Sequence, residues 1–253
     1  IFILKIFLLL FYYLLNKKYM DRKKEEKNEK HFGFLLVDKS IGPTSFDVIY
    51  QLRKITGIKK IGHTGTLDPF ASGLLIVAIG KEATKKISQF VKLDKKYEAE
   101  IILGAESNTY DRTGIITEKK EIKKINKKDI IKVLKKIKET KEQIPPMYSA
   151  KKIGGKKLYE LARKNIEIDR PVQLITISKI KIIDYSWPKI RLKITCSSGT
   201  YIRSIANDLG KELNCGAYLN ELRRTKIGRY RVEKAKKIEN IDSENWTKYI
   251  FNK

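Results

Sequence analysis

The most unusual stretch of this 253-residue chain is residues 62–75, which read GHTGTLDPFASGLL. Three glycines and one proline punctuate it, and it holds a single carboxylate, Asp68. Because glycine lets a backbone come close to a ligand, such a loop presents one acid to whatever binds there. A structural alternative exists, since an aspartate before a proline often caps a helix. The stretch therefore makes Asp68 a candidate catalytic residue and leaves a capping role open.

The rest of the chain is strongly basic. Lys and Arg number 55 against 29 Asp and Glu, a formal net charge of +26. A field of that sign attracts polyanions, although AT-rich coding also enriches a chain in lysine. The composition therefore favours nucleic acid as the partner.

Cysteine and histidine are scarce. Cys196 and Cys215 are the only cysteines, and His31 and His63 are the only histidines. These are too few for a disulfide framework or a four-ligand zinc site. We expect a cytoplasmic protein without a structural metal.

The N-terminal residues differ from the rest. Residues 1–15 are apolar, but they fall short of the roughly 20 needed to span a bilayer, and Lys5 interrupts them. An interfacial anchor or a signal-peptide-like core is an alternative. The first methionine is Met20, so our hypothesis is that residues 1–19 lie outside the native protein. Residues 1–32 are predicted to be a non-globular extension.

Globular patterning begins at Gly33. The run GFLLVDK predicts a buried strand, and residues 44–57 predict a helix capped by Thr44 or Ser45 and closed by Gly57. Its apolar face holds Val48, Ile49, Leu52 and Ile55. Further strands are predicted over 97–103, 175–183 and 190–196, and a helix over 126–138 with Asn126 as cap and Ile130, Val133, Leu134 and Ile137 inward. This mixture predicts one α+β domain over 33–240, followed by a short tail over 241–253.

Residues 62–75 closely resemble the catalytic signature of the TruB family of tRNA pseudouridine synthases, which isomerise uridine 55 in the T loop. Matches continue in order through GKEATK (80–85), DKKY (94–97), YDRTG (110–114), QIPPMYSAKKIGGKKLYELAR (143–163), CSSGTYIRSIANDLG (196–210) and GAYLNELRRTKIG (216–228). They cover nearly all of residues 33–240. The resemblance implies the pseudouridine synthase fold, with a mixed, mainly antiparallel central sheet flanked by helices and loops. It also implies a reaction that needs no cofactor.

The resemblance assigns roles to three catalytic residues. Asp68 matches the essential carboxylate, Arg203 matches the arginine that pairs with it, and Tyr97 matches the tyrosine whose ring lies against the target uracil. A guanidinium beside Asp68 is expected to keep that carboxylate ionised. Tyr201, two residues before Arg203, is predicted on the same strand face. For the tyrosines, plain core packing is the alternative.

Four residues are candidates for RNA binding. His63 matches the family histidine that helps displace the target nucleotide, although a lone histidine is more often structural. Lys39 matches a lysine near the T loop and Lys85 a basic residue at the RNA surface, with a plain solvated face as the alternative for both. Tyr201 completes the set. The expected partner is the T arm of tRNA, with no metal, no membrane and no obligate protein partner.

The chain departs from the family pattern at three places. The usual Asp-Lys-Pro reads Asp38-Lys39-Ser40, a usual leucine is replaced by Lys151, and the chain reaches Lys253 without the PUA domain that many members carry. The main alternative function is a non-catalytic tRNA chaperone on the same fold. A guide-RNA-dependent synthase is less favoured, because the PUA domain is expected there. A membrane-bound protein rests on residues 1–15 alone.

Overall fold

The computed structural model describes residues 12, 13, 16, 31–120 and 122–252. The predicted extension over 1–32, including the proposed start at Met20, lies outside these residues except at 12, 13, 16, 31 and 32. In the described part of the chain, nine strands form one central sheet. Seven of them follow the order β11 (Ile177–Ser186), β12 (Lys189–Cys196), β4 (Lys95–Leu103), β13 (Ala217–Ile227), β3 (Ser72–Ile79), β1 (Gly33–Lys39) and β15 (Lys236–Lys237).

The pairing in this sheet is mainly antiparallel. Strands β11, β12, β4 and β13 pair antiparallel in succession, and so do β3 and β1. Two short strands extend the sheet, β14 (Tyr230–Arg231) beside β13 and β2 (Ile61–His63) beside β3. Only the β13–β3 and β1–β15 pairs of the described sheet are parallel. The predicted fold class is confirmed.

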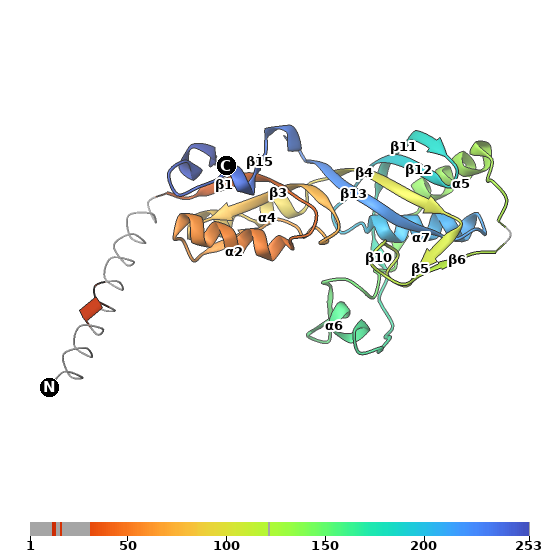
Figure 1. Ribbon diagram of the computed structural model, residues 1–253, viewed down its shortest axis with the longest axis horizontal. Helices are drawn as coiled ribbons and strands as arrows, with labels where there is room; N and C mark the ends of the chain where they lie inside the picture. The colour runs from red at the N-terminus through yellow and green to blue at the C-terminus, as the bar shows by residue number, and fades with distance from the viewer. Residues whose placement is uncertain (1–11, 14–15, 17–30, 121, 253) are drawn as a thin grey trace.

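Helices lie against both halves of the sheet (Figure 1). Each half packs its helices around its own hydrophobic core. Helices α5 (Lys127–Glu139) and α7 (Ile202–Glu212) pack with β4, β11, β12 and β13. Helix α2 (Ser45–Thr56) packs under β1 and β3. Shorter elements complete the described chain: α3 (Lys81–Lys85), α4 (Ser88–Val91), β5 (Ala105–Ser107), β6 (Ile116–Glu118), β7 (Glu142–Gln143), β8 (Lys152–Ile153), β9 (Lys156–Lys157), α6 (Leu158–Ala162), β10 (Gln173–Leu174), η1 (Val232–Lys234), η2 (Ile238–Asn240) and η3 (Trp246–Tyr249).

Both predicted helices form with their predicted caps. Thr44 and Asp47 make a capping box, with Thr44 N donating to Asp47 Oδ2 at 2.8 Å, and Gly57 ends the helix at φ +72°. Asn126 caps α5 by accepting a bond from Lys128 N at 2.9 Å. Most of the apolar positions predicted to face inward are buried in the two cores. Ile55 of α2 and Val133 of α5 are only partly buried against them.

The parallel pair β13–β3 joins the two halves. Its register places Arg223 opposite Ser72 and Arg224 opposite Gly73. Gly73 adopts φ +107°, and a Cβ there would lie 2.3 Å from the carbonyl oxygen of Arg224. Only glycine allows this approach without strain. The close contact brings the loop before β3 against β13.

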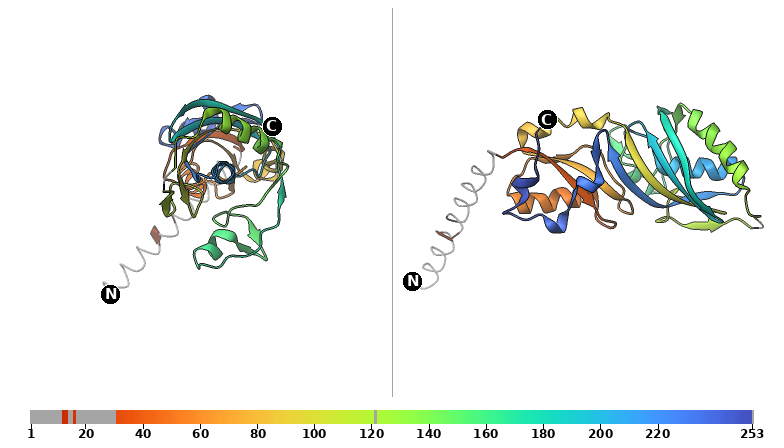
Figure 2. Two further views of the ribbon diagram at one scale, coloured as in Figure 1. Left: turned by 90° about the vertical axis from the view of Figure 1, so that its right-hand side faces the viewer. Right: turned by 90° about the horizontal axis from the view of Figure 1, so that it is seen from above.

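Two segments lie around this framework. The segment around α6 stands away from the sheet in Figure 1 and in the end-on view of Figure 2. Residues 241–252, predicted as a tail, pack against β1: Trp246 is 2 % exposed, and Phe34 and Phe251 exchange backbone hydrogen bonds. None of the described helices combines the length and apolar character needed to cross a bilayer.

Candidate active site

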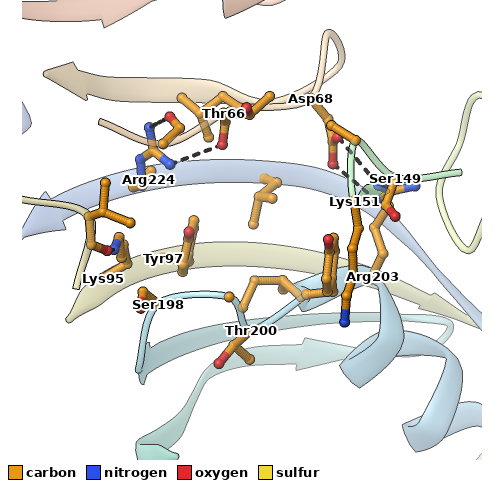
Figure 3. Close-up of a pocket in the computed structure, with 18 of the residues that line it drawn as sticks. Thr66, Asp68, Lys95, Tyr97, Ser149, Lys151, Ser198, Thr200, Arg203 and Arg224 are labelled. Carbon is orange, nitrogen blue, oxygen red and sulfur yellow. Dashed lines mark hydrogen bonds and ion pairs between the residues drawn. The ribbon is translucent and has the colours of Figure 1, made fainter. Parts of the chain in front are cut away.

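A cavity of about 290 Å³ opens where the two halves of the sheet meet (Figure 3). Its walls come from β4, β13 and three segments, residues 64–68, 149–151 and 198–203. Its size is at the small end of the roughly 300–1,000 Å³ typical of ligand sites. The signature stretch that begins at Gly62 therefore forms one wall of a cavity.

Asp68 lies in the irregular loop between β2 and β3. No helix follows it, because residues 69 and 70 form a turn in which Ala71 N donates to the carbonyl of Asp68 at 3.1 Å. The alternative that Asp68 caps a helix is therefore wrong. Its carboxylate is 35 % exposed and lines the cavity.

Arg203 holds this carboxylate from the first turn of α7. Its Nε lies 3.1 Å from Asp68 Oδ2, and its Nη2 donates to Oδ1 at 3.3 Å. The guanidinium is only 4 % exposed and also donates to the carbonyl of Tyr148 at 2.8 Å. The ion-pair contact and the single hydrogen bond together hold the carboxylate in place, and a lysine, which lacks the planar fork, would not make both contacts.

Asp111 is a residue that the sequence reasoning missed. Arg203 Nη1 lies 3.2 Å from Asp111 Oδ2, so the guanidinium bridges two carboxylates. Asp111 is 4 % exposed, and it accepts from Thr109 Oγ1 at 2.9 Å and from Thr113 N at 2.9 Å. Asp111 therefore helps to fix the position of the Arg203 guanidinium that contacts Asp68. The YDRTG motif contained the signal, but nothing in the sequence linked Asp111 to Arg203.

Burial and the neighbouring positive charges act in opposite directions on the pKa of the Asp68 carboxyl. Desolvation in the cavity raises the pKa of Asp68. Arg203 opposes that rise, and the Asp111 charge adds to it. The guanidinium therefore moderates the effect of burial on the pKa of Asp68 and does not reverse it.

Two tyrosines line the same cavity. Tyr97 on β4 is 8 % exposed, and burial raises its pKa, so the ring lies in the wall as a neutral aromatic group. Tyr201 was predicted on a strand beside Arg203, and this was wrong. It is the N-cap residue of α7, fixed by Gln143, which accepts from Tyr201 N at 2.8 Å and donates to its carbonyl at 3.1 Å.

Arg224 of β13 anchors the loop that carries Asp68 and was also missed. It is 2 % exposed and donates to three carbonyls, those of Leu74 at 2.7 Å, Thr66 at 3.2 Å and Gly65 at 3.0 Å. Figure 3 shows it on the wall near Tyr97 and Thr66. The sequence pair Arg223-Arg224 does not reveal which arginine points inward.

Comparison with known proteins decides the family. The profile described as "TruB family pseudouridylate synthase (N terminal domain)" matches residues 53–202. That of the "tRNA pseudouridylate synthase B C-terminal domain" matches residues 203–251. The chain is 45 % identical over 219 residues to tRNA pseudouridine synthase B of Clostridium kluyveri, covering 87 % of this chain and 75 % of that protein. This chain belongs to the TruB family.

Other relatives agree with this assignment. The tRNA pseudouridine synthase B of Endomicrobium trichonymphae is 43 % identical over 83 % of this chain and 91 % of its own length. A solved chain from a Cbf5-Nop10-Gar1 complex superposes with a TM-score of 0.63 at 28 % identity, over 81 % of this chain. This TruB family chain spans about half, 52 %, of that solved chain.

Lys39 of this TruB family chain does not lie at the surface. It is 1 % exposed, and its Nζ donates to the carbonyls of Ser40 and Pro43 at 2.8 Å each and to that of Pro69 at 3.5 Å. Burial lowers the pKa of Lys39 to about 8. The alternative of a plain solvated face is therefore wrong, because the ammonium ties two loops together beside Asp68. The RNA-binding role of Lys39 stays a prediction.

Two other predicted RNA-binding residues lie outside the cavity wall. His63 ends β2, one residue before the lining residue Thr64, and burial lowers its pKa, so the imidazole is neutral. Lys85 ends α3, is 59 % exposed and pairs with Glu82 at 2.8 Å. Among the described residues, His, Cys, Asp and Glu side chains form no group of three that would hold a metal ion.

Proposed function

We propose that this chain isomerises uridine to pseudouridine at position 55 in the T loop of tRNA, with Asp68 as its catalytic carboxylate. The observation that carries the proposal is the Asp68–Arg203 contact at 3.1 Å on the wall of a cavity that Tyr97 also lines. Family membership and 45 % identity to a named tRNA pseudouridine synthase B support the reaction.

The reaction rearranges atoms within one nucleotide. The N1–C1′ glycosidic bond breaks, the uracil turns, a C5–C1′ bond forms, C5 loses a proton and N1 gains one, so that the product is an isomer of the substrate. Among the residues that line the cavity, Asp68 is the only carboxylate. Attack on C1′ and abstraction of a proton both need an unprotonated carboxylate, so Asp68 is the residue that either route would use. Nothing is transferred from a donor, and the proposed reaction therefore needs no cofactor.

The target base must leave the RNA stack to reach this carboxylate. Flipping a nucleotide costs a few kcal/mol, and stacking on an aromatic ring offsets part of that cost. We assign the stacking to Tyr97, which is buried in the cavity wall, and a second aromatic contact to Tyr201. His63, next to the lining residue Thr64, is the proposed residue that helps displace the base.

The substrate is held through its phosphates. The net charge of +26 supplies a long-range attraction for RNA, and the exposed Lys85 is a proposed contact for the T arm. We place this activity in the cytoplasm, with no obligate protein partner.

A non-catalytic tRNA chaperone is the alternative. It is disfavoured because binding alone does not need a carboxylate that Arg203 holds in the cavity. A guide-RNA-dependent enzyme is also disfavoured, because this chain is 45 % identical to a relative named tRNA pseudouridine synthase B.

The test is to incubate the purified protein with an unmodified tRNA transcript and to map pseudouridine by base-specific chemical labelling. We expect one new pseudouridine, at position 55. A transcript with cytidine at that position is the control and stays unmodified. Modification only outside the T loop would contradict the proposed site, and no modification at all would contradict the proposed reaction.

A further inference from the structure

The cavity is rich in positive charge. Four cationic side chains line it, Lys95, Lys151, Arg203 and Arg224, against the single carboxylate of Asp68. A cavity with this balance attracts an anion. The anions of an RNA nucleotide are the phosphodiesters on either side of its ribose.

Three of the four cations are committed elsewhere. Arg203 contacts Asp68 and Asp111, and the guanidinium of Arg224 donates hydrogen bonds to three backbone carbonyls. Lys95 is 6 % exposed and donates to the carbonyl of Val91. Burial also lowers the pKa of Lys95 to about 8. These three cations shape the cavity wall.

Lys151 is different. It is half-buried at the cavity, and its Nζ donates at 3.2 Å to Gln173 Oε1, which is a neutral amide. In the part of the chain that the structure describes, no carboxylate lies within ion-pair distance of it. An ammonium has three donors, so two remain available. Figure 3 shows the side chain running along the cavity wall, with its ammonium directed away from Asp68.

The support behind Lys151 is well fixed. Gln173 lies on β10, which pairs with β7, and its Nε2 donates to the carbonyl of Gly199 at 2.6 Å. Gly199 itself lines the cavity. The amide of Gln173 therefore ties the ammonium of Lys151 to the 198–203 wall and limits the positions that it samples.

We propose that Lys151 binds one of the two phosphodiesters that flank the target uridine once the nucleotide has flipped. The inference rests on the proposed function and deepens it. Uracil against Tyr97 and ribose beside Asp68 leave the flanking phosphates at the edge of the cavity. Lys151 is the lining cation with donors available there, so it adds affinity to the flipped state.

The first test compares Lys151→Met with Lys152→Met on a T-arm stem-loop. The control residue is the next along the chain, on β8, and is exposed. For Lys151→Met we expect affinity to fall about fivefold to tenfold, more than turnover at saturating RNA falls. The slope of log affinity against log salt should drop by about 0.7, one single-strand phosphate contact. Lys152→Met should stay within twofold of wild type, and Lys151→Arg should bind nearly normally.

The second test removes the phosphate charge. Stem-loops with a neutral methylphosphonate immediately 5′ or 3′ of the target uridine are bound to wild type and to Lys151→Met. At one of the two positions, the wild type should lose as much affinity as Lys151→Met loses on the natural RNA. Combining the two changes should cost little more. Fully additive losses at both positions, or an unchanged salt slope for Lys151→Met, would overturn the proposal. Failure of wild type to form pseudouridine contradicts the proposed function instead, because the binding readouts do not depend on turnover.

Discussion

Two neighbouring arginines of β13, Arg223 and Arg224, test how the loop that carries Asp68 is held in place. Arg224 is 2 % exposed and bonds three carbonyls of residues 65–74, whereas Arg223 is 41 % exposed and pairs with Asp38 at 2.8 Å. Changing each to lysine keeps the charge and removes the planar fork. Each variant therefore loses the contacts that only a guanidinium makes, at a buried position for Arg224 and at a half-exposed one for Arg223.

The structure sets the size of each effect. A lysine at 224 loses at least two of three bonds from a charged donor, each contributing about 1.5–3 kcal/mol, so the free energy of unfolding should fall by about 3 kcal/mol or more. A chain of this size then loses roughly 6–12 °C in Tm. Arg223 donates to both oxygens of Asp38, at 3.0 and 2.8 Å, but it is 41 % exposed, and a lysine there keeps the charge and one of the two bonds. The loss should therefore be about 1 kcal/mol, and Arg223→Lys should lower Tm by about 4 °C or less.

Activity should separate the variants further. A displacement of about 1 Å at a reacting group costs about a hundredfold in rate. Arg224→Lys should therefore reduce the single-turnover rate about a hundredfold at a temperature where both variants are folded, and Arg223→Lys should stay close to wild type. Thermal unfolding and single-turnover pseudouridine formation are the two assays. Equal Tm values and equal rates for the two variants would refute this account of the loop.

Three further outcomes follow from the same geometry. The acid limb of the pH–rate profile should lie above the ordinary aspartate pKa of 3.8, because burial raises the pKa of Asp68 and turnover needs the unprotonated form. Protonation of Asp68 itself favours the folded state, so acid unfolding that coincides with this limb would contradict the assignment. Asp111→Asn should move the acid limb of the pH–rate profile to lower pH, because the like charge that raises the pKa of Asp68 is gone. A shift of that limb to higher pH would contradict this role of Asp111. Gly73→Ala should lower the midpoint of urea unfolding, because its Cβ meets the Arg224 backbone; an unchanged midpoint would argue against the close β3–β13 contact.

Local elements followed from local patterns. The helix after Thr44 has its capping box and its terminal glycine within the segment itself, so the sequence contained everything that defines its bounds. Strands 33–39 and 97–103 were similarly visible as apolar runs and appear as β1 and within β4. The predicted mixed, mainly antiparallel sheet also formed.

The errors concern contacts between segments distant in sequence. Lys39 is buried because residues 40–43 and Pro69 fold over it, and no local pattern reports that enclosure. Tyr201 was assigned to a strand because strand periodicity was extended past residue 200, where Gln143 instead fixes the start of α7. Asp111 reaches Arg203 across 92 residues of chain. The family resemblance identified Asp68 and Arg203. The residues that pack around them could be found only in the structure.

The central claim is that Asp68 performs the chemistry. Asp68→Asn keeps the size of the side chain and removes its negative charge, and single-turnover pseudouridine formation on tRNA measures the consequence directly. The account predicts no detectable product with tRNA affinity close to that of wild type. Pseudouridine formation by Asp68→Asn at more than a trace of the wild-type rate would contradict it.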